Sequence, residues 1–506
     1  MDRLTATIFR LMRPRLNKID GFATNGGRVQ REQLKYLVTS AKHTYIGELY
    51  DFGSIRRYED FAERIMLQTY ENLRRGIFTM INGSDNVLWP SKVKWYAQSS
   101  GTTNDKSKYI PITQEILRAH YKGGFDTVAL YLRNNPHSSF FSHKGLILGG
   151  CHRPSLMQTR SHCGDLSGIL IQKINPLVNL LRVPSKKISL MNEWEAKIKA
   201  LVENTRGEDV GNISGVPSWM LVLIKAMLEK TGCGNLSEVW PNLEVFFHGG
   251  IGFEPYRDQY KSLIPVERMR YMETYNASEG FFGIQDDPSD ASMLLMPDYG
   301  IFYEFVPAAD VHKSGADVFT WDTVEKGRNY AIVITTAGGL WRYVIGDTIR
   351  FTSLHPHKFV ISGRTTHYIN AFGEELIVDN ADNAISAACR MTGAKVKEYT
   401  AAPLFMLDKA QGMHEWLIEF EKIPESVARF ADELDRCLKE HNSDYEAKRY
   451  KDLALRAPKV IVAPKDIFSD WLKGKGKLGG QHKVPRLSND RRIIDELLSI
   501  MQQRGA

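Results

Sequence analysis

The chain has 506 residues, of which 43% are hydrophobic and 25% are charged, and its formal net charge is +7. That length can hold two to four domains, and the composition is that of an ordinary soluble globular protein. The lysines and arginines are scattered, which argues against a nucleic-acid surface and leaves room for an anionic small ligand.

No segment approaches about 18 uninterrupted apolar residues, and the N-terminus is too short and too interrupted for a signal peptide. Five cysteines at wide spacing suit a reducing compartment. We therefore expect a cytoplasmic protein that contacts no membrane. The pairs Cys151-His152 and His162-Cys163 contain zinc-ligand residue types, although structural zinc sites use closer spacing.

Residues 1 to 90 show helical patterns. Arg31 to Tyr50 and Tyr58 to Leu73 carry apolar residues at helical spacing, which predicts two packing helices. Asp51-Phe52-Gly53 predicts a helix stop between them.

A polar loop follows the apolar and aromatic run from Val93 to Ala97. From Ser99 to Lys108 it gathers hydroxyl side chains, a glycine and two lysines, which could aim donors and positive charge at a polyphosphate. It is not a P-loop, because Asp105 and not glycine precedes Lys106. Taken alone, a cluster of this composition is more often a polar surface hairpin.

Thr113-Gln114-Glu115 predicts a capped helix start, and a helical pattern continues to about Leu132. Gly123-Gly124 either weakens this helix or lets a ligand approach its backbone. Arg118 and Lys122 lie four residues apart and could hold a substrate carboxylate, or form a solvated helix face.

Strands and helices then alternate in α/β style. Leu243 to Phe247 predicts a strand that ends in His248-Gly249-Gly250, where open α/β sheets place ligands and a nucleotide base could lie. Arg270 to Thr274 predicts a strand that leads to Glu279. This carboxylate could bind a magnesium ion that bridges phosphates, or it could be a surface turn residue.

Strands are also predicted from Gly300 to Pro307 and from Tyr330 to Thr336. The second leads through glycines to Asp347, which could accept ribose hydroxyls or stand in a hairpin turn. Residues 367 to 506 predict a compact α/β unit, in which a glycine- and lysine-rich loop precedes Lys483.

Three of these segments together resemble the GH3 family of acyl-acid amido synthetases, a branch of the adenylate-forming superfamily that includes acyl-CoA ligases and luciferase. They are Ser99-Ser100-Gly101-Thr102-Thr103, Tyr275-Asn276-Ala277-Ser278-Glu279 and Trp341-Arg342-Tyr343-Val344-Ile345-Gly346-Asp347. The resemblance extends from about Leu34 to Arg486.

The resemblance implies an α/β fold with a large N-terminal domain, residues 1–366, that holds ATP and an acid. A small α+β domain, residues 367–506, would rotate over the site between half-reactions. The residues expected to bind the nucleotide are Ser99, Ser100, Gly101, Thr102, Thr103, Gly249, Gly250, Tyr275, Ser278, Asp347 and Arg364. Glu279 is expected to bind Mg²⁺, and Lys108 and Lys483 are expected to be the catalytic lysines.

The implied reaction joins a carboxylic acid to AMP with release of pyrophosphate, and then transfers the acyl group to an amine, expected to be an amino acid. The aromatic residues Trp341, Tyr275 and Phe281-Phe282 would suit a flat aromatic or alicyclic acid, or they form core. We expect a monomer or weak dimer. The alternatives are an acyl-CoA or carrier-protein ligase, and a catalytically silent acid-binding protein, suggested by Asp105 where the family usually has glycine.

Overall fold

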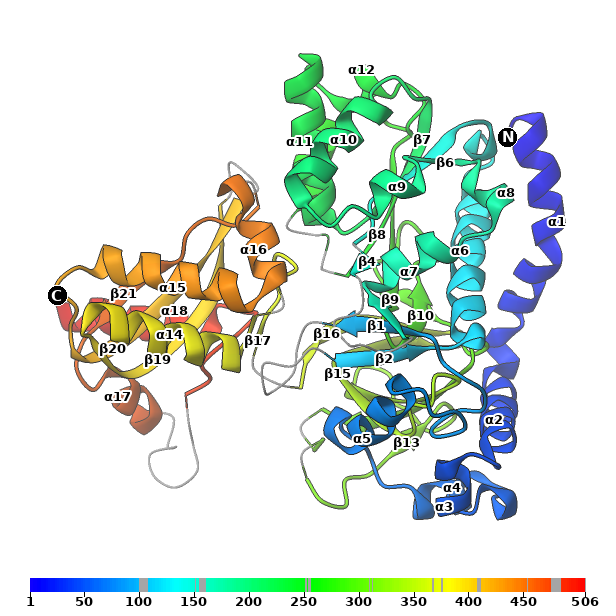
Figure 1. Cartoon of the computed structure of the whole chain (residues 1–506), viewed down its shortest axis with the longest axis horizontal. Helices are drawn as coiled ribbons and strands as arrows, with labels where there is room; N and C mark the ends of the chain where they lie inside the picture. The colour runs from blue at the N-terminus through cyan, green and yellow to red at the C-terminus, as the bar shows by residue number, and fades with distance from the viewer. Residues whose placement is uncertain are drawn as a thin grey trace.

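The computed structural model describes residues 1–99, 108–150, 152–153, 161–250, 253, 256–308, 310–311, 313–365, 368–374, 376–406, 411–452, 454–474 and 484–505. Figure 1 shows a large body that contains the N-terminus and a smaller body that carries the C-terminus. The predicted α/β fold with two unequal parts is confirmed. The boundary after residue 366 falls on residues outside the described ones and stays a prediction.

A twelve-stranded mixed sheet runs through the large body in the order β13-β12-β14-β15-β16-β11-β10-β9-β8-β7-β3-β6. Its strands are β3 (Lys144–Ile147), β6 (Arg182–Val183), β7 (Val210–Gly215), β8 (Val245–Gly249), β9 (Arg270–Ala277), β10 (Gly280–Ile284), β11 (Met293–Leu295), β12 (Ile301–Pro307), β13 (Phe319–Thr320), β14 (Asn329–Thr336), β15 (Tyr343–Leu354) and β16 (His357–Arg364). The pairs from β6 to β9 are parallel, and the other pairs are antiparallel. Parallel strands place their carboxyl ends at one edge, which is where the site lies.

A second sheet of four strands has the order β2-β1-β5-β4. Its strands are β1 (Trp95–Ser99), β2 (Lys108–Ile112), β4 (His152–Arg153) and β5 (His162–Gly164). Ser99 and Lys108 are register partners in the β1–β2 pair, so the predicted phosphate loop starts and ends at neighbouring positions.

The predicted N-terminal helices are present with different bounds: α2 begins before Arg31 and ends at Ala41, and Tyr58 to Leu73 is divided between α4 and α5. The observed helices are α1 (Arg3–Asp20), α2 (Phe22–Ala41), α3 (Tyr45–Leu49), α4 (Tyr58–Arg64) and α5 (Tyr70–Ile81). The predicted helix from Tyr58 to Leu73 is wrong at its middle, because the chain straightens and Gln68 joins β15. Its backbone N–H donates to Arg342 O at 2.8 Å and its carbonyl accepts from Val344 N at 2.9 Å.

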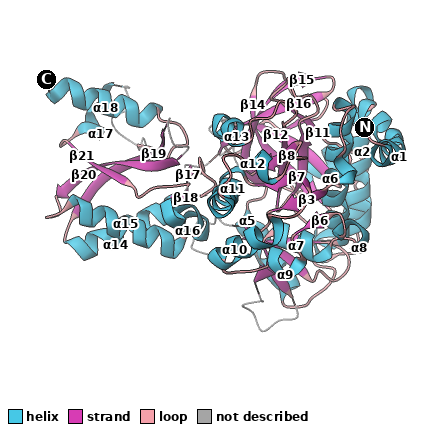
Figure 2. Cartoon of the chain, turned by 90° about the horizontal axis from the view of Figure 1, so that it is seen from above, coloured by secondary structure: helices cyan, strands magenta, loops and turns pink. Residues whose placement is uncertain are grey.

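The remaining helices of the large body cover the faces of the main sheet (Figures 1 and 2). They are α6 (Gln114–Asn134), α7 (Leu166–Lys173), α8 (Pro176–Asn179), α9 (Lys186–Ser189), α10 (Trp194–Thr205), α11 (Pro217–Thr231), α12 (Leu236–Val239) and α13 (Arg257–Leu263). As predicted, α6 begins at a cap, where the Thr113 hydroxyl accepts from Ile116 N at 3.2 Å.

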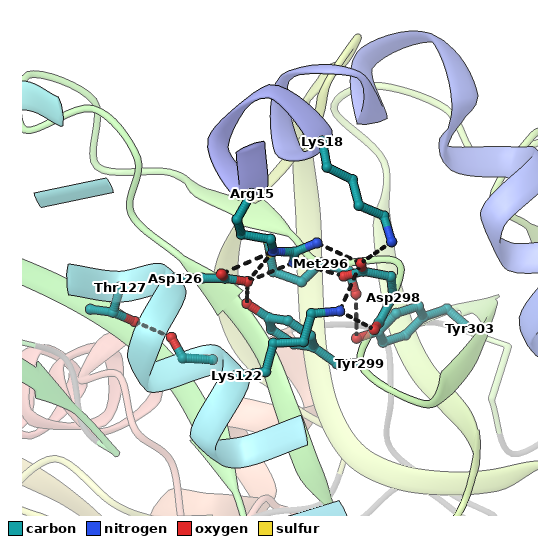
Figure 3. A network of polar contacts seen from close by, with 10 residues as sticks. Arg15, Lys18, Lys122, Asp126, Thr127, Met296, Asp298, Tyr299 and Tyr303 are labelled. Carbon is teal, nitrogen blue, oxygen red and sulfur yellow. Dashed lines mark hydrogen bonds and ion pairs between the residues drawn. The ribbon is translucent and has the colours of Figure 1, made fainter. Parts of the chain in front are cut away.

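Helix α6 is fixed to α1 by a buried ionic network (Figure 3). The Arg15 guanidinium binds Asp126 of α6 at 2.6 Å and Asp298 at 2.6 Å, and both carboxylates are almost inaccessible to water. Lys122 also donates to Asp298, at 2.8 Å. Burial raises the pKa of Asp298, but the hydrogen bonds and charges of Arg15 and Lys122 outweigh this effect and lower it to about 2. The network therefore sets the position of α6.

A second buried ion pair joins two segments of the family resemblance. Arg342, at the start of β15, binds Glu304 of β12 with a shortest distance of 2.8 Å, and their side chains are 5% and 0% exposed. Arg342 also donates to the carbonyl oxygens of Ala62 and Ile65, at 2.9 and 2.5 Å. These residues therefore hold the N-terminal helices to the sheet and do not face the site.

The small body has a three-stranded sheet, β19-β20-β21, between two pairs of helices (Figure 2). Its elements are β17 (Tyr368–Ile369), β18 (Leu376–Ile377), α14 (Val378–Thr392), β19 (Lys395–Met406), β20 (Gln411–Lys422), α15 (Val427–His441), α16 (Ser443–Arg449), β21 (Lys459–Ala463), α17 (Ile467–Gly474) and α18 (Arg492–Gly505). Leu417 packs with α17 and α18, whereas its neighbours Trp416 and Ile418 pack with α14 and α15. This alternation places the two helix pairs on opposite faces of the sheet.

Candidate active site

A cavity of about 1740 Å³ opens where β7, β8 and β9 end. Its walls come from both bodies, since Asn370, Ser443, Asp444 and Asn489 of the C-terminal part line it together with the sheet edge. The volume exceeds the roughly 300–1,000 Å³ of a typical single-ligand pocket. It can therefore hold more than one substrate.

Tyr275 of β9 and Asp347 of β15 meet on the cavity wall. The Tyr275 hydroxyl donates a hydrogen bond to the Asp347 carboxylate, which fixes the orientation of this acidic group. Asp347 stands where the sequence predicts a partner for ribose hydroxyls. Arg364 of β16 is its register partner, and the placement of the Arg364 side chain lies outside the described structure.

Ser278 and Glu279 follow the end of β9 and also line the cavity. Glu279 is 7% exposed, so it is not the surface turn residue that was the alternative for this position. A carboxylate at the wall of a polar cavity is the kind of hard oxygen ligand that Mg²⁺ prefers. The residue present therefore fits the predicted metal.

Gly249 and Gly250 close the end of β8 and line the same cavity. A Cβ atom at Gly249 would lie 2.3 Å from Thr274 O, and Gly250 has φ +85°. Both positions therefore require glycine, which leaves bare backbone against which a flat base can lie.

Lys108 enters the cavity from β2. Its ammonium donates to the Tyr343 hydroxyl at 3.2 Å and lies over the Tyr70 ring at 5.9 Å. The lysine is thus held at the edge of the site, next to the base of the predicted phosphate loop.

Several predicted residues lie outside the described structure. Ser100, Gly101, Thr102, Thr103 and Lys483 belong to its gaps, and only the backbone of Ser99 is described. The roles of all the predicted site residues stay predictions. The structure does place Lys108, Gly249, Gly250, Tyr275, Ser278, Glu279 and Asp347 on one cavity.

The sequence analysis missed Glu273, two residues before Tyr275 on the same strand. It lines the cavity and is the register partner of the buried His248. Burial raises the pKa of Glu273 to about 7, against the opposing charge of Arg257. The period of two along β9, which places Glu273 and Tyr275 on one face, was the available signal.

Two suggested roles in acid binding are wrong. Lys122 is bound into the network with Asp298 and does not line the cavity. Trp341 and Phe282 are core residues, 1% and 0% exposed, and the Trp341 indole donates to Leu88 O at 2.9 Å. Tyr275 and Phe281 do line the cavity.

One end of the cavity is an apolar groove between α6 and the α7–α8 segment, which we call the acyl groove. Its walls include Tyr121, Phe125, Val128, Phe141, Leu170, Ile174, Val178 and Leu181. Phe125 is 43% exposed and Val178 51% exposed, so this part of the wall presents apolar surface to the solvent. The Tyr121 hydroxyl donates to Leu170 O at 2.9 Å and so joins the two walls.

The two neighbouring glycines of α6, Gly123 and Gly124, have different structural roles. A Cβ at Gly123 would lie 2.5 Å from the Phe281 ring, so this glycine permits close packing. Gly124 lines the cavity and has no atom within 4 Å of a Cβ built on it. The helix is continuous, so the predicted weakening did not break it. Gly124 therefore leaves open volume in the acyl groove.

Comparison with known proteins identifies relatives along most of the chain. Models described as the GH3 family N-terminal, central and C-terminal domains match residues 15–269, 294–364 and 379–492. The chain is 23% identical to the indole-3-acetic acid-amido synthetase GH3.4 of Arabidopsis thaliana, over 93% of this chain and 91% of that protein.

Solved structures share the fold. The GH3.15 acyl acid amido synthetase superimposes with a TM-score of 0.60 at 18% identity, over 96% of this chain and 95% of that chain. A 2-hydroxyisobutyryl-CoA ligase, solved with 2-HIB-AMP and CoA, superimposes with a TM-score of 0.58 at 14% identity, over 94% and 92%. At these identities the superpositions support the architecture alone.

Proposed function

Because the chain belongs to the GH3 family, we propose that it is an ATP-dependent acyl-acid amido synthetase, a ligase that forms a carbon–nitrogen bond through an acyl-adenylate. The observation that supports this most directly is the shared cavity, which gathers Asp347, Glu279 and the Gly249-Gly250 turn. These are the groups needed for a ribose, a metal-bound phosphate and a base.

In the first half-reaction, a carboxylate oxygen of the acid attacks the α-phosphorus of ATP. The bond between the α- and β-phosphates breaks, and pyrophosphate leaves with its electron pair. We propose that Asp347, oriented by Tyr275, accepts the ribose hydroxyls, while the backbone of Gly249 and Gly250 faces the base. The protein's main task is to align the reactants and balance the phosphate charge.

Positive charge at the phosphates is proposed to come from Lys108, from Lys483 and from Mg²⁺ held by Glu279. The metal supplies charge neutralisation when it is bound. The position of the Lys108 ammonium at the cavity edge, where it donates to the Tyr343 hydroxyl, supports this proposal. Lys483 would reach the site when the small body turns toward it, as the family resemblance implies.

We propose that the acid carries a bulky or extended apolar group that lies in the acyl groove. Apolar area removed from water contributes roughly 25 cal/mol per Å² to such binding. The groove is continuous with the cavity that contains Ser278 and Glu279, so one molecule can reach from the apolar walls to the phosphate end. The Arabidopsis relative is named for indole-3-acetic acid, which carries an aromatic ring system.

In the second half-reaction the nitrogen of an amine attacks the acyl carbon, AMP leaves with the former acid oxygen, and the amine loses a proton. We propose an amino acid as the amine, by analogy with the family. The described part of the chain contains no helix long and apolar enough to cross a membrane. We also propose that the enzyme is cytoplasmic and acts as a monomer or weak dimer.

A screen of pyrophosphate release tests this function. Purified protein, ATP and Mg²⁺ are incubated with aromatic, alicyclic and straight-chain acids, with and without a mixture of amino acids, and products are identified by mass spectrometry. We expect acyl-amino acid conjugates. Acyl-CoA formed in a parallel reaction with coenzyme A would instead favour an acyl-CoA ligase, the activity for which the 2-hydroxyisobutyryl-CoA ligase is named. Acid binding without pyrophosphate release would identify a silent binding protein.

A further inference from the structure

One charged side chain of the small body is buried directly against the large body. The ammonium nitrogen of Lys448 lies 4.3 Å from the centroid of the Trp219 ring. Lys448 is 2% exposed, and a cation–π contact is strongest when the cation is withdrawn from water. The two residues lie in the matched C-terminal and N-terminal family domains, so the contact joins two units of the chain.

Both partners are held rigidly by their own domains. Next to Lys448 in α16, Arg449 binds Asp435 of α15 at 2.6 Å, and the Tyr445 hydroxyl donates to Asp435 at 2.7 Å. On the other side, the Trp219 ring packs against the ring of Trp194 with centroids 5.5 Å apart. A shift of either partner therefore requires a shift of its whole element.

The contact lies at the cavity. Lys448 and Trp219 both border it, beside Ser443 and Asp444 of the small body and Val216 at the end of β7. The position of the small body therefore decides which side chains close the cavity. A contact that fixes this position acts on the site without touching the reacting atoms.

The residue that follows Lys483 in the chain does not line the cavity, whereas Ser443, Asp444 and Lys448 do. Val484, the residue after Lys483, packs with Leu417 and Phe468 on the α17–α18 side of the sheet. Tyr445 of α16 packs with Trp416 on the opposite side. The arrangement in Figure 2 presents α16 to the large body. The family resemblance implies that adenylation brings Lys483 to the site, and α16 is not the segment that carries this lysine.

We propose that Lys448, acting through Trp219, is a positioning residue that holds the small body in the arrangement used for amide formation. This inference rests on the proposed two-step function. Adenylation uses the other arrangement, in which the Lys448–Trp219 contact is broken. Removing the contact therefore slows the second half-reaction and spares the first.

The test measures the two half-reactions separately in the full-length enzyme, with the acid and amino acid that give the highest rates in the pyrophosphate screen. Acyl-adenylate formation is followed in a single turnover without amine. Amide formation is followed after adding the amine to enzyme loaded with a synthetic acyl-adenylate. In Lys448→Met and Trp219→Leu we expect amide formation to fall about tenfold, the scale of a desolvated cation–π contact, and adenylation to change less than about twofold.

Three further variants separate positioning from folding. Lys448→Arg keeps a cation over the ring and should restore most of the amide rate. The double variant should be no slower than either single variant, because both remove one contact. Lys459→Met removes another lysine of the small body, paired with Glu415 at 2.8 Å, and should leave both rates unchanged.

Equal losses in both half-reactions, or an unchanged amide rate in Lys448→Met, would overturn the positioning role while leaving the amido synthetase function intact. A wild-type enzyme that forms acyl-adenylate but passes it to coenzyme A and to no amine would overturn the proposed function, and this inference with it.

Discussion

The hydroxyl of Tyr275 donates a hydrogen bond to the carboxylate of Asp347, joining β9 to β15 across the cavity wall. Asp347 is the residue proposed to bind the ribose, so the phenol acts as the support that orients it. A hydrogen bond to a charged group contributes roughly 1.5–3 kcal/mol. The relationship makes a single-atom test possible.

Tyr275→Phe should raise the KM for ATP about tenfold in the pyrophosphate assay, because the Asp347 carboxylate loses its orienting donor. The turnover number should change less than about threefold, since the ribose contact is made in the ground state and the transition state alike. Tyr303→Phe is the matched control. Its hydroxyl is buried, donates to Met296 O at 3.3 Å, and lies away from the cavity. An unchanged KM in Tyr275→Phe would contradict the ribose assignment of Asp347.

Gly124→Leu should lower kcat/KM for bulky or long-chain acids by about tenfold and leave acetate and propionate unaffected, because the new side chain fills the acyl groove. Folding should tolerate it, since glycine inside a helix is less favourable than leucine by up to about 1 kcal/mol. Rates are measured by pyrophosphate release across the acid series.

Gly123→Ala supplies the contrast at the neighbouring position. Its Cβ would meet the Phe281 ring at 2.5 Å, so thermal stability should fall there and rise or hold in Gly124→Ala. If kcat/KM fell equally for all acids in Gly124→Leu, the acyl tail would lie elsewhere.

Arg342→Ala should destabilise the large body by about 3–5 kcal/mol, because it leaves Glu304 charged and buried without its partner. Calorimetry or urea unfolding measures the loss. In Arg342→Met combined with Glu304→Gln the loss should be smaller, since no uncompensated charge remains. Arg28→Ala breaks an exposed pair with Glu32 and should cost less than about 1 kcal/mol. A mild effect of Arg342→Ala would contradict the stabilising role of this buried ion pair.

Glu273→Gln should flatten the dependence of stability on pH. Burial raises the pKa of Glu273 from 4.5 to about 7, so the native state keeps its proton at a pH where the unfolded state has lost it. Wild-type stability from this group therefore falls as pH rises from about 4.5 to above 7, by about 3 kcal/mol in total. Urea midpoints at pH 5 and pH 8 should differ less in the variant. Glu421→Gln, an exposed change on β20, should leave the difference as in the wild type.

The α/β class, the strand from Leu243 to Phe247 and the capped start of α6 could be predicted, because local spacing and a Thr113 cap determine them. The break at Gln68 could not, since its hydrogen bonds run to β15, far away in the chain. Long-range pairing overrides a local helical pattern. The same limit applies to Lys122, whose partner Asp298 is 176 residues away.

That Asp347 and Glu279 lie on one cavity could be predicted from short motifs, while their roles stay predictions. Glu273 was missed because its only signal was the period of two that it shares with Tyr275 along β9, and its burial is known only from the fold. Trp341 and Arg342 drew attention as part of a motif, but they serve packing and charge pairing. A sequence motif therefore does not distinguish residues that support the fold from residues that line the site, and the structure is needed to separate them.

Through the buried ionic network, the acyl groove is supported by a helix that lies outside the main sheet. The first helix supports one wall of the acyl groove and even contributes Met12 to the cavity lining, yet it takes no part in the strands that carry the nucleotide residues. Under the proposed function, substitutions in α1 should therefore change which acids are accepted and leave the nucleotide-binding residues in place. Related enzymes that accept different acids should then differ mainly by substitutions in α1 and α6.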